Sequence, residues 1–172
     1  VFMNTRNYSE ALDALNRIPN KNAEVKRAYQ RIAYYRALEL FNNLKYREAI
    51  DLFDRSLEYA SYDNEIRALC CYWQGEAWYN IRAYDKAIES YDNFMGITGA
   101  SRLPEYLRAQ YGLGYSYFSQ ENYTEAASWF RRFASGVKKQ DKLLADAYNR
   151  LGDCYFMGRT YWQAIDYYDK AY

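Results

Sequence analysis

The sequence contains no histidine, and this absence restricts its chemistry more than any other feature. Without an imidazole, Ser–His and Cys–His nucleophile pairs and histidine-containing zinc sites are excluded within these 172 residues. No CxxC, P-loop or GxGxxG pattern occurs, and "GLGYSY" lies in a helical pattern with no strand before it. We therefore expect no enzymatic activity, no metal site and no cofactor.

Cysteine is scarce as well, with only three residues. Cys70 and Cys71 are neighbours that point about 100° apart on a helix, so they are poorly placed to bridge each other. Cys154 lies two repeat units further along, beyond disulfide reach. We expect three small buried thiols.

An excess of charge of one sign is also missing. The chain has 23 basic and 22 acidic side chains and a net charge of +1, without a long basic run, so we expect no nucleic-acid partner. No apolar run is long enough to insert into a membrane. The N-terminal "VFMNTRNYSE" lacks the basic and apolar regions of a signal peptide and an initiating methionine, so we expect a fragment of a longer chain.

What the sequence does contain is a motif that returns five times with a period of about 38 residues. A tyrosine opens each copy, an alanine follows three residues later, and a large apolar or aromatic residue follows four residues after the alanine. Spacings of three and four place these side chains on one helical face. The three columns are Tyr8, Tyr46, Tyr84, Tyr123 and Tyr161; Ala11, Ala49, Ala87, Ala126 and Ala164; and Leu15, Phe53, Tyr91, Phe130 and Tyr168.

A second set of columns precedes each tyrosine motif. A small residue, Ala37, Gly75, Gly114 or Gly152, is followed by an aromatic or apolar pair. Each unit therefore predicts two amphipathic helices, A and B, joined by a short turn, and no sheet is expected. The predicted helices span 22–43, 45–60, 64–81, 83–97, 103–120, 122–136, 141–158 and 160–172, with an earlier B helix ending before Pro19.

The glycines inside the predicted A helices require an explanation, because glycine costs roughly 1 kcal/mol relative to alanine there. We expect close helix packing to offset that cost. The alanine of helix B, Ala87, Ala126 or Ala164, is predicted to fit the gap at Gly75, Gly114 or Gly152. The recurring tyrosine is predicted to pack under the corner between the two helices.

These motifs resemble the tetratricopeptide repeat. Tyr148-x2-Leu151-Gly152-x2-Tyr155 followed by Ala164-x3-Tyr168 is similar to the signature of that family, with Tyr148 in its tryptophan slot. The chain departs from the pattern at Arg36 and Gln74, which stand in the leucine slot. The period of about 38 residues exceeds the usual roughly 34 by about one helical turn, as in extended units that resemble those of bacterial envelope proteins.

The resemblance implies an all-α, right-handed superhelical solenoid of antiparallel helix pairs. We expect one array with a partial unit at 1–19 and units at 22–61, 63–100, 102–139 and 141–172. Phe2 and Met3 align with the aromatic pair of later units, which predicts that the chain starts near the end of an A helix. The resemblance favours the bacterial periplasm or cell envelope, with the cytoplasm as the alternative.

The resemblance also implies that the A helices line a concave surface that binds a protein or peptide. Glu76 and Asp153 would supply negative charge there, and Tyr34, Leu38, Tyr72 and Glu76 depart from the Lys and Asn that hold a terminal carboxylate in chaperone-binding members. We expect partners with apolar side chains and a basic residue. The predicted groove residues are Tyr34, Leu38, Tyr72, Glu76, Tyr79, Arg108, Tyr111, Tyr115, Asn149 and Asp153.

Three alternatives remain open at this point. The tyrosines Tyr34, Tyr72 and Tyr111 serve equally well as packing between successive A helices. The array could have a structural role and self-associate through open ends. Aromatic faces also suit the binding of glycans.

Overall fold

The structure is a computed structural model that describes residues 7–139 and 141–172, and the regular structure of these residues is entirely helical. This confirms the predicted all-α solenoid of antiparallel helix pairs. Phe2 and Met3, which were aligned with the later aromatic pairs, lie outside the described residues. The helices are α1 (Tyr8–Asn16), α2 (Ala23–Asn42), α3 (Tyr46–Leu57), α4 (Asn64–Asn80), α5 (Tyr84–Gly96), η2 (Ala100–Arg102, a 3-10 helix), α6 (Glu105–Ser119), α7 (Tyr123–Gly136), α8 (Lys142–Met157) and α9 (Tyr161–Ala171).

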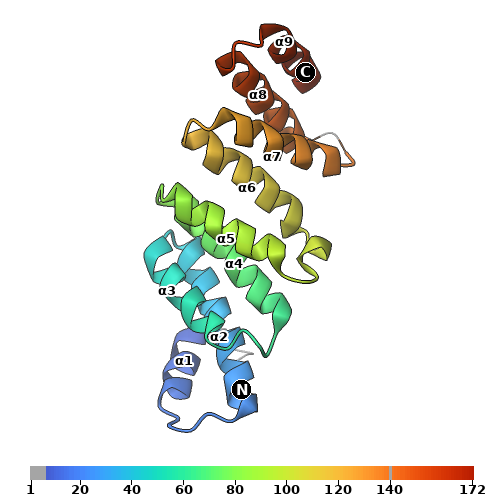
Figure 1. The fold of residues 1–172 in the computed structure, drawn as a ribbon. Helices are drawn as coiled ribbons and strands as arrows, with labels where there is room; N and C mark the ends of the chain where they lie inside the picture. Colours follow the sequence, from blue (N-terminus) through green and yellow to red (C-terminus); the bar gives the residue numbers. More distant parts are fainter. Residues whose placement is uncertain (1–6, 140) are drawn as a thin grey trace.

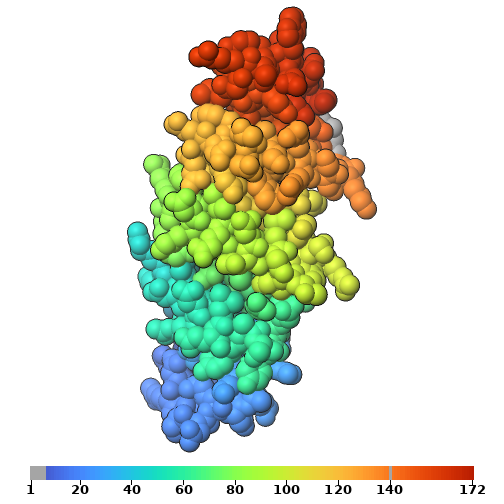
Figure 2. Space-filling model, in the orientation of Figure 1, coloured from blue at the N-terminus to red at the C-terminus, as the bar shows by residue number. Residues whose placement is uncertain are grey.

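The helices stack in pairs along one axis, from α1 at one end to α8 and α9 at the other (Figure 1). The A helices are α2, α4, α6 and α8, and each packs on the B helix that follows it. Successive units appear as adjoining bands in Figure 2. Helix α4 also contacts both α2 and α6, the A helices of the units before and after it.

Short polar residues start most of these helices. Side chains at Asn22, Asp63 and Asp141 accept hydrogen bonds from backbone N–H groups at 2.9, 3.1 and 2.9 Å in the first turns of α2, α4 and α8. Such caps satisfy donors that have no partner within the helix. The predicted helix boundaries agree with the observed ones to within about three residues, the usual error of such predictions.

The corner between helices A and B has the same backbone geometry in all four complete pairs. Leu44, Arg82, Glu121 and Arg159 adopt left-handed conformations with φ of 60 to 62°. The next residue donates its N–H to a carbonyl five residues earlier, at 2.9 Å each time, as in a Schellman motif. Glycine is the usual residue at this position, so each corner carries a conformational cost.

The recurring tyrosines pack under these corners, as predicted. Each ring contacts the last aromatic residue of the preceding A helix, with centroid distances of 5.2 Å for Tyr46–Phe41 and 5.4 Å for Tyr123–Phe118. The pairs Tyr84–Tyr79 and Tyr161–Phe156 repeat the contact at 5.6 and 5.4 Å.

The glycines of the A helices make room for an aromatic ring, which corrects the prediction that an alanine fills the gap. A Cβ atom on Gly75 would lie 2.6 Å from the ring of Tyr91, and one on Gly114 would lie 2.7 Å from Phe130. At Gly152 the neighbour is Tyr168, at 2.4 Å. These rings stand one turn after the alanine, so helix B presents its bulkiest side chain to the glycine. The alanines Ala49, Ala87, Ala126 and Ala164, like Ala37, are buried nearby.

Other features of the interior agree with the sequence. The thiols of Cys70, Cys71 and Cys154 are free and buried, and burial raises the pKa of Cys70 to about 12. Gln74, in the leucine slot, is buried and donates a 2.6 Å hydrogen bond to the carboxylate of Asp54 on α3, which satisfies its polar end. Within the described residues, no helix combines the length and apolarity needed to cross a membrane.

Candidate partner-binding groove

The three equivalent tyrosines of successive A helices, Tyr34, Tyr72 and Tyr111, are divided between core and surface. Tyr34 and Tyr72 are only 5% and 3% exposed. Tyr34 packs on Phe53, and Tyr72 packs on Tyr91 and Phe94, so both belong to the interior. Tyr111 is half-buried and keeps one side open. The packing alternative therefore holds for Tyr34 and Tyr72, and of these three tyrosines only Tyr111 is partly exposed.

The remaining predicted residues spread over three A helices. Leu38 is partly buried against the apolar core formed largely by α2 and α3, and Asn149 is half-buried on α8. Arg108 is exposed on α6. Asp153 is occupied by bonds within the chain, which are described below.

Four predicted residues come together around one hollow between α4 and α6. Glu76 and Tyr79 come from α4, and Tyr111 and Tyr115 come from α6, with Tyr91 and Gly112 completing the lining of a space of about 290 Å³. Tyr111 and Tyr115 meet edge to face at 5.0 Å, and Tyr79 approaches Tyr115 at 6.5 Å. The hollow therefore has aromatic walls and one carboxylate.

Glu76 stands in this hollow with one oxygen already bonded. Its Oε1 accepts a 2.8 Å hydrogen bond from the hydroxyl of Tyr91. Burial raises the pKa of the Glu76 carboxyl, and this effect outweighs the hydrogen bond from Tyr91, the nearby hydroxyl of Tyr72 and the positive charge of Arg108, all of which lower it. Burial of the Tyr91 hydroxyl, together with the neighbouring Glu76 carboxylate, raises the pKa of Tyr91 far above that of a free phenol.

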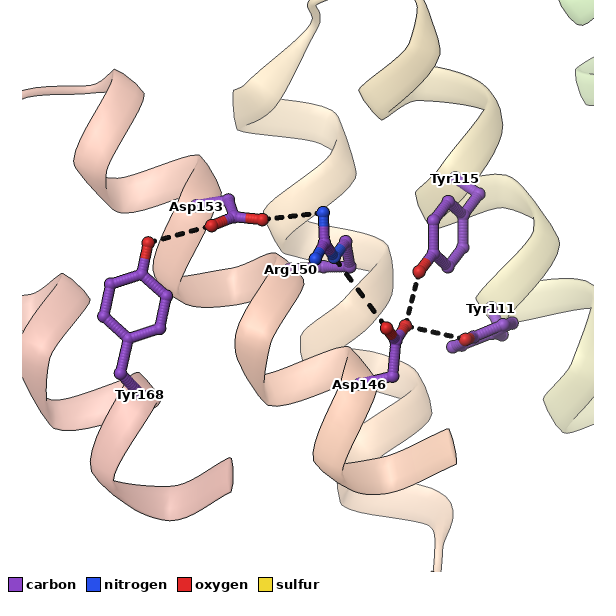
Figure 3. Close-up of polar contacts among 6 residues, drawn as sticks. All are labelled: Tyr111, Tyr115, Asp146, Arg150, Asp153 and Tyr168. Atoms are coloured by element: carbon purple, nitrogen blue, oxygen red, sulfur yellow. Dashed lines mark hydrogen bonds and ion pairs between the residues drawn. The ribbon is translucent and has the colours of Figure 1, made fainter. Parts of the chain in front are cut away.

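A second polar cluster joins α6 to α8 beside the hollow (Figure 3). The hydroxyls of Tyr111 and Tyr115 both donate to Oδ2 of Asp146, the former at 2.7 Å. Burial and the bond to Asp146 raise the pKa of Tyr115 to about 12. Because one carboxylate holds both phenols, the two rings that form a wall of the hollow are fixed in orientation.

Arg150 extends this cluster along α8. Its Nη1 pairs with Oδ2 of Asp153 at 2.8 Å, and its Nε lies 3.9 Å from Oδ1 of Asp146. The other oxygen of Asp153 accepts a 2.8 Å hydrogen bond from Tyr168. Asp153 is therefore already paired within the chain and has little charge to offer a partner, unlike Glu76.

Sequence reasoning missed Tyr91, Gly112, Asp146, Arg150 and Tyr168, but a signal for two of them was present. The acids Glu76 and Asp153 each follow a glycine, and the B helices of those two units carry Tyr91 and Tyr168. Where the residue after the small column is Leu38 or Tyr115, the B helix carries a phenylalanine instead, Phe53 or Phe130. A phenol is thus matched by an acceptor in each case, as buried hydroxyls require.

Solved structures with the same architecture confirm the fold. BtubC (BKLC) from P. vanneervenii superposes with a TM-score of 0.74 at 15% identity, over 95% of this chain and 68% of that chain. MamA from Desulfovibrio magneticus RS-1 gives 0.68 at 18% identity, over 99% and 86%. A kinesin light chain from Podosopora anserina with TPR-like repeats gives 0.65 at 13% identity, over 99% and 88%. No curated protein matches the sequence.

Sequence comparison agrees with these structures. The profile of the tetratricopeptide repeat family matches residues 34–94 and 97–142, which together make up more than half of the chain. These ranges run from the second half of α2 through α7 and include the hollow between α4 and α6. The chain therefore belongs to the tetratricopeptide repeat family.

Proposed function

We propose that this chain is a protein-interaction scaffold, without catalytic activity of its own, that binds a peptide segment of a partner along its A helices. Repeat arrays of this family generally serve as protein–protein interaction scaffolds. Stacked helix pairs create an extended inner surface that suits a linear segment better than a compact ligand.

The observation that supports this proposal is the hollow between α4 and α6. It lies between two successive A helices, and Glu76, Tyr79, Tyr111 and Tyr115 line it. Aromatic residues give a large contact area at low cost in conformational entropy, which is why they are enriched at recognition sites. Since Tyr34 and Tyr72 are core residues, the proposed groove is shorter than the predicted one and is centred on α4 and α6.

A random peptide library displayed against the purified chain tests the proposal. We expect selected peptides to lose binding to Tyr79→Ala, because Tyr79 lines the hollow and is half-buried rather than part of the interior. Tyr62→Ala is the matched control, since Tyr62 is a half-buried tyrosine just before α4 and does not line the hollow. Circular dichroism must show unchanged helicity for both variants. Failure to select any peptide sensitive to Tyr79→Ala would contradict the proposal.

Self-association is a second candidate, favoured by the outer face of the last unit. Phe156 and Ile165 are 54% and 48% exposed, whereas their counterparts Phe118 and Ala127 are half-buried and buried. In the earlier unit, α8 packs on this face. We propose that a second copy of the chain occupies the corresponding face of α9. Sedimentation at several concentrations should show a dimer that Ile165→Asp abolishes, and a strict monomer would contradict this candidate.

A further inference from the structure

One column of the A helices explains why the hollow exists. The residue two positions before the small column is Trp73 on α4, Gly112 on α6 and Arg150 on α8. Trp73 reaches back to Phe41 of the preceding A helix, with ring centroids 5.0 Å apart. Arg150 likewise places its guanidinium 5.6 Å from the ring centroid of Phe118. At two junctions, therefore, a side chain from the later helix covers an aromatic residue of the earlier one.

The junction between α4 and α6 has no side chain at this column position, and its aromatic residue meets α6 through the edge of Tyr115, with ring centroids 6.5 Å apart. Its column residue is Gly112, and the aromatic residue of the earlier helix, Tyr79, lines the hollow together with that glycine. A Cβ atom on Gly112 would lie 2.6 Å from the hydroxyl of Tyr91, the group that bonds Glu76. Glycine at this position therefore leaves room for the Tyr91–Glu76 bond and contributes no side chain where Trp73 and Arg150 cover an aromatic ring at the other two junctions.

The chemistry of the three junctions shows what the empty one would accept. At the α2–α4 junction, the residue equivalent to Glu76 is Leu38, and the side chain that covers the aromatic ring of the earlier helix is the apolar Trp73. At the α6–α8 junction, the equivalent residue is Tyr115, and the side chain that covers the aromatic ring of the earlier helix is the cation Arg150. With a carboxylate at this position and aromatic rings around it, the α4–α6 junction matches a cationic group even better.

Among the described residues, Glu76 is also not neutralised by an ion pair. The four ion pairs found in residues 7–139 and 141–172 involve other acids. Arg108 is the basic residue whose charge influences Glu76, but its side chain is exposed and lies outside the lining of the hollow. The size of the space, about 290 Å³, falls just below the roughly 300–1,000 Å³ of pockets that hold drug-sized molecules, so it suits a single side chain.

We propose that the hollow binds an arginine side chain of the partner peptide, with its guanidinium over Tyr79 and paired with Glu76. This inference rests on the proposed scaffold function and specifies what the scaffold recognises. The planar guanidinium stacks on an aromatic face and donates to a carboxylate at the same time, which a lysine ammonium does less well. The chain's own Arg150 shows the same combination one unit later, over Phe118 and bonded to Asp153.

A small probe tests the pocket independently of any peptide. N-acetyl-arginine amide is titrated into the isotope-labelled chain, and the amide resonance of Gly112 is followed by NMR. We expect a saturable shift, binding about tenfold weaker for Glu76→Gln, and little change for Glu89→Gln, an exposed glutamate on α5. The neutral citrulline analogue should bind far more weakly, and the lysine analogue several-fold more weakly. Equal affinity for citrulline or lysine, or for wild type and Glu76→Gln, would overturn the proposal.

The peptide library separates the failure of this inference from the failure of the scaffold function. Selected peptides should share an arginine whose replacement by alanine has no further effect once Glu76→Gln is present. Peptides that require Tyr79 but tolerate both Glu76→Gln and loss of every arginine would overturn the arginine pocket and leave the scaffold intact. A Gly112 shift by N-acetyl-arginine amide without any selected peptide would overturn the scaffold function alone.

Discussion

The junction between α4 and α6 and the junction between α6 and α8 share one backbone design but have different contents. At the first, Gly112 leaves a hollow in which Glu76 carries the charge. At the second, Arg150 lies over Phe118, and Asp146 holds Tyr111 and Tyr115 (Figure 3). The residue two positions before the small column thus decides whether the junction is covered by a side chain of the chain itself, as by Arg150, or keeps a hollow, as at Gly112. In a solenoid each unit contacts mainly its neighbours, so one junction can differ without disturbing the rest.

The comparison depends first on the packing that both regions share, the ring of helix B against the glycine of helix A. Gly75→Leu and Gly152→Leu should each lower the free energy of unfolding by about 1–3 kcal/mol, because the added side chain meets a ring. The loss should be larger at Gly75, since Tyr91 is 1% exposed and has no room to move. Urea denaturation measures both. Gly96→Leu is the control, because no atom lies within 4 Å of a Cβ there. Wild-type stability of Gly75→Leu would contradict this packing.

The two acid–phenol pairs should differ when the phenol is removed. Tyr91→Phe leaves Glu76 without its 2.8 Å hydrogen bond in a buried setting, so we expect a loss of about 1–3 kcal/mol. Tyr168→Phe should cost less, because Asp153 keeps its bond to Arg150. Thermal and urea unfolding of both variants, with Tyr62→Phe as control, give the comparison. Equal losses would show that the Arg150 bond does not compensate.

The raised pKa of Glu76 predicts a pH effect specific to the open junction. A carboxyl whose pKa is higher in the folded state binds its proton more tightly there, so ionising it at higher pH lowers the stability. Glu76→Gln removes this penalty while keeping an acceptor for Tyr91. The gain in melting temperature over wild type should therefore be full above the raised pKa and shrink as the pH falls through it. A gain that is independent of pH, or also given by Glu89→Gln, would contradict the assignment.

The smallest expected effect tests whether the backbones of the compared units are equivalent. Arg82 and Arg159 occupy the same left-handed corner position, with φ of 61° and 60°. Replacing either by glycine should stabilise the chain by about 0.5–1 kcal/mol, since the strain of an L residue in this region is larger than the entropy cost of glycine. Alanine at the same sites should give no such gain. Clearly different effects of Arg82→Gly and Arg159→Gly in urea unfolding would show that the two corners are not equivalent.

Much of the fold could be predicted because its signals are local. The spacing of Tyr8, Ala11 and Leu15, repeated four more times, specifies an amphipathic helix without reference to any distant residue. The corner residues could not be predicted in this way, because Leu44 and Glu121 are not typical left-handed residues. Their conformation follows from the packing of the helices on either side, which overrides the local preference.

The candidate groove was predicted less well than the fold. Position on helix A suggested that Tyr34, Tyr72 and Tyr111 share one environment, yet the first two are buried and the third is half-buried and bonds Asp146. Burial depends on which residues of the adjoining units face each ring. That is a property of contacts between residues about 35 positions apart, which helical periodicity does not contain.

The helix pairs and the small, aromatic and tyrosine columns followed from periodicity, because a helix repeats its faces every 3.6 residues wherever it lies. The partner of each column followed from three-dimensional packing. Gly75, Gly114 and Gly152 make room for rings rather than for alanines, and Gly112 lines a hollow because it places no side chain between α4 and α6. Such contacts form between helices, where crossing geometry and side-chain volume decide which atoms meet.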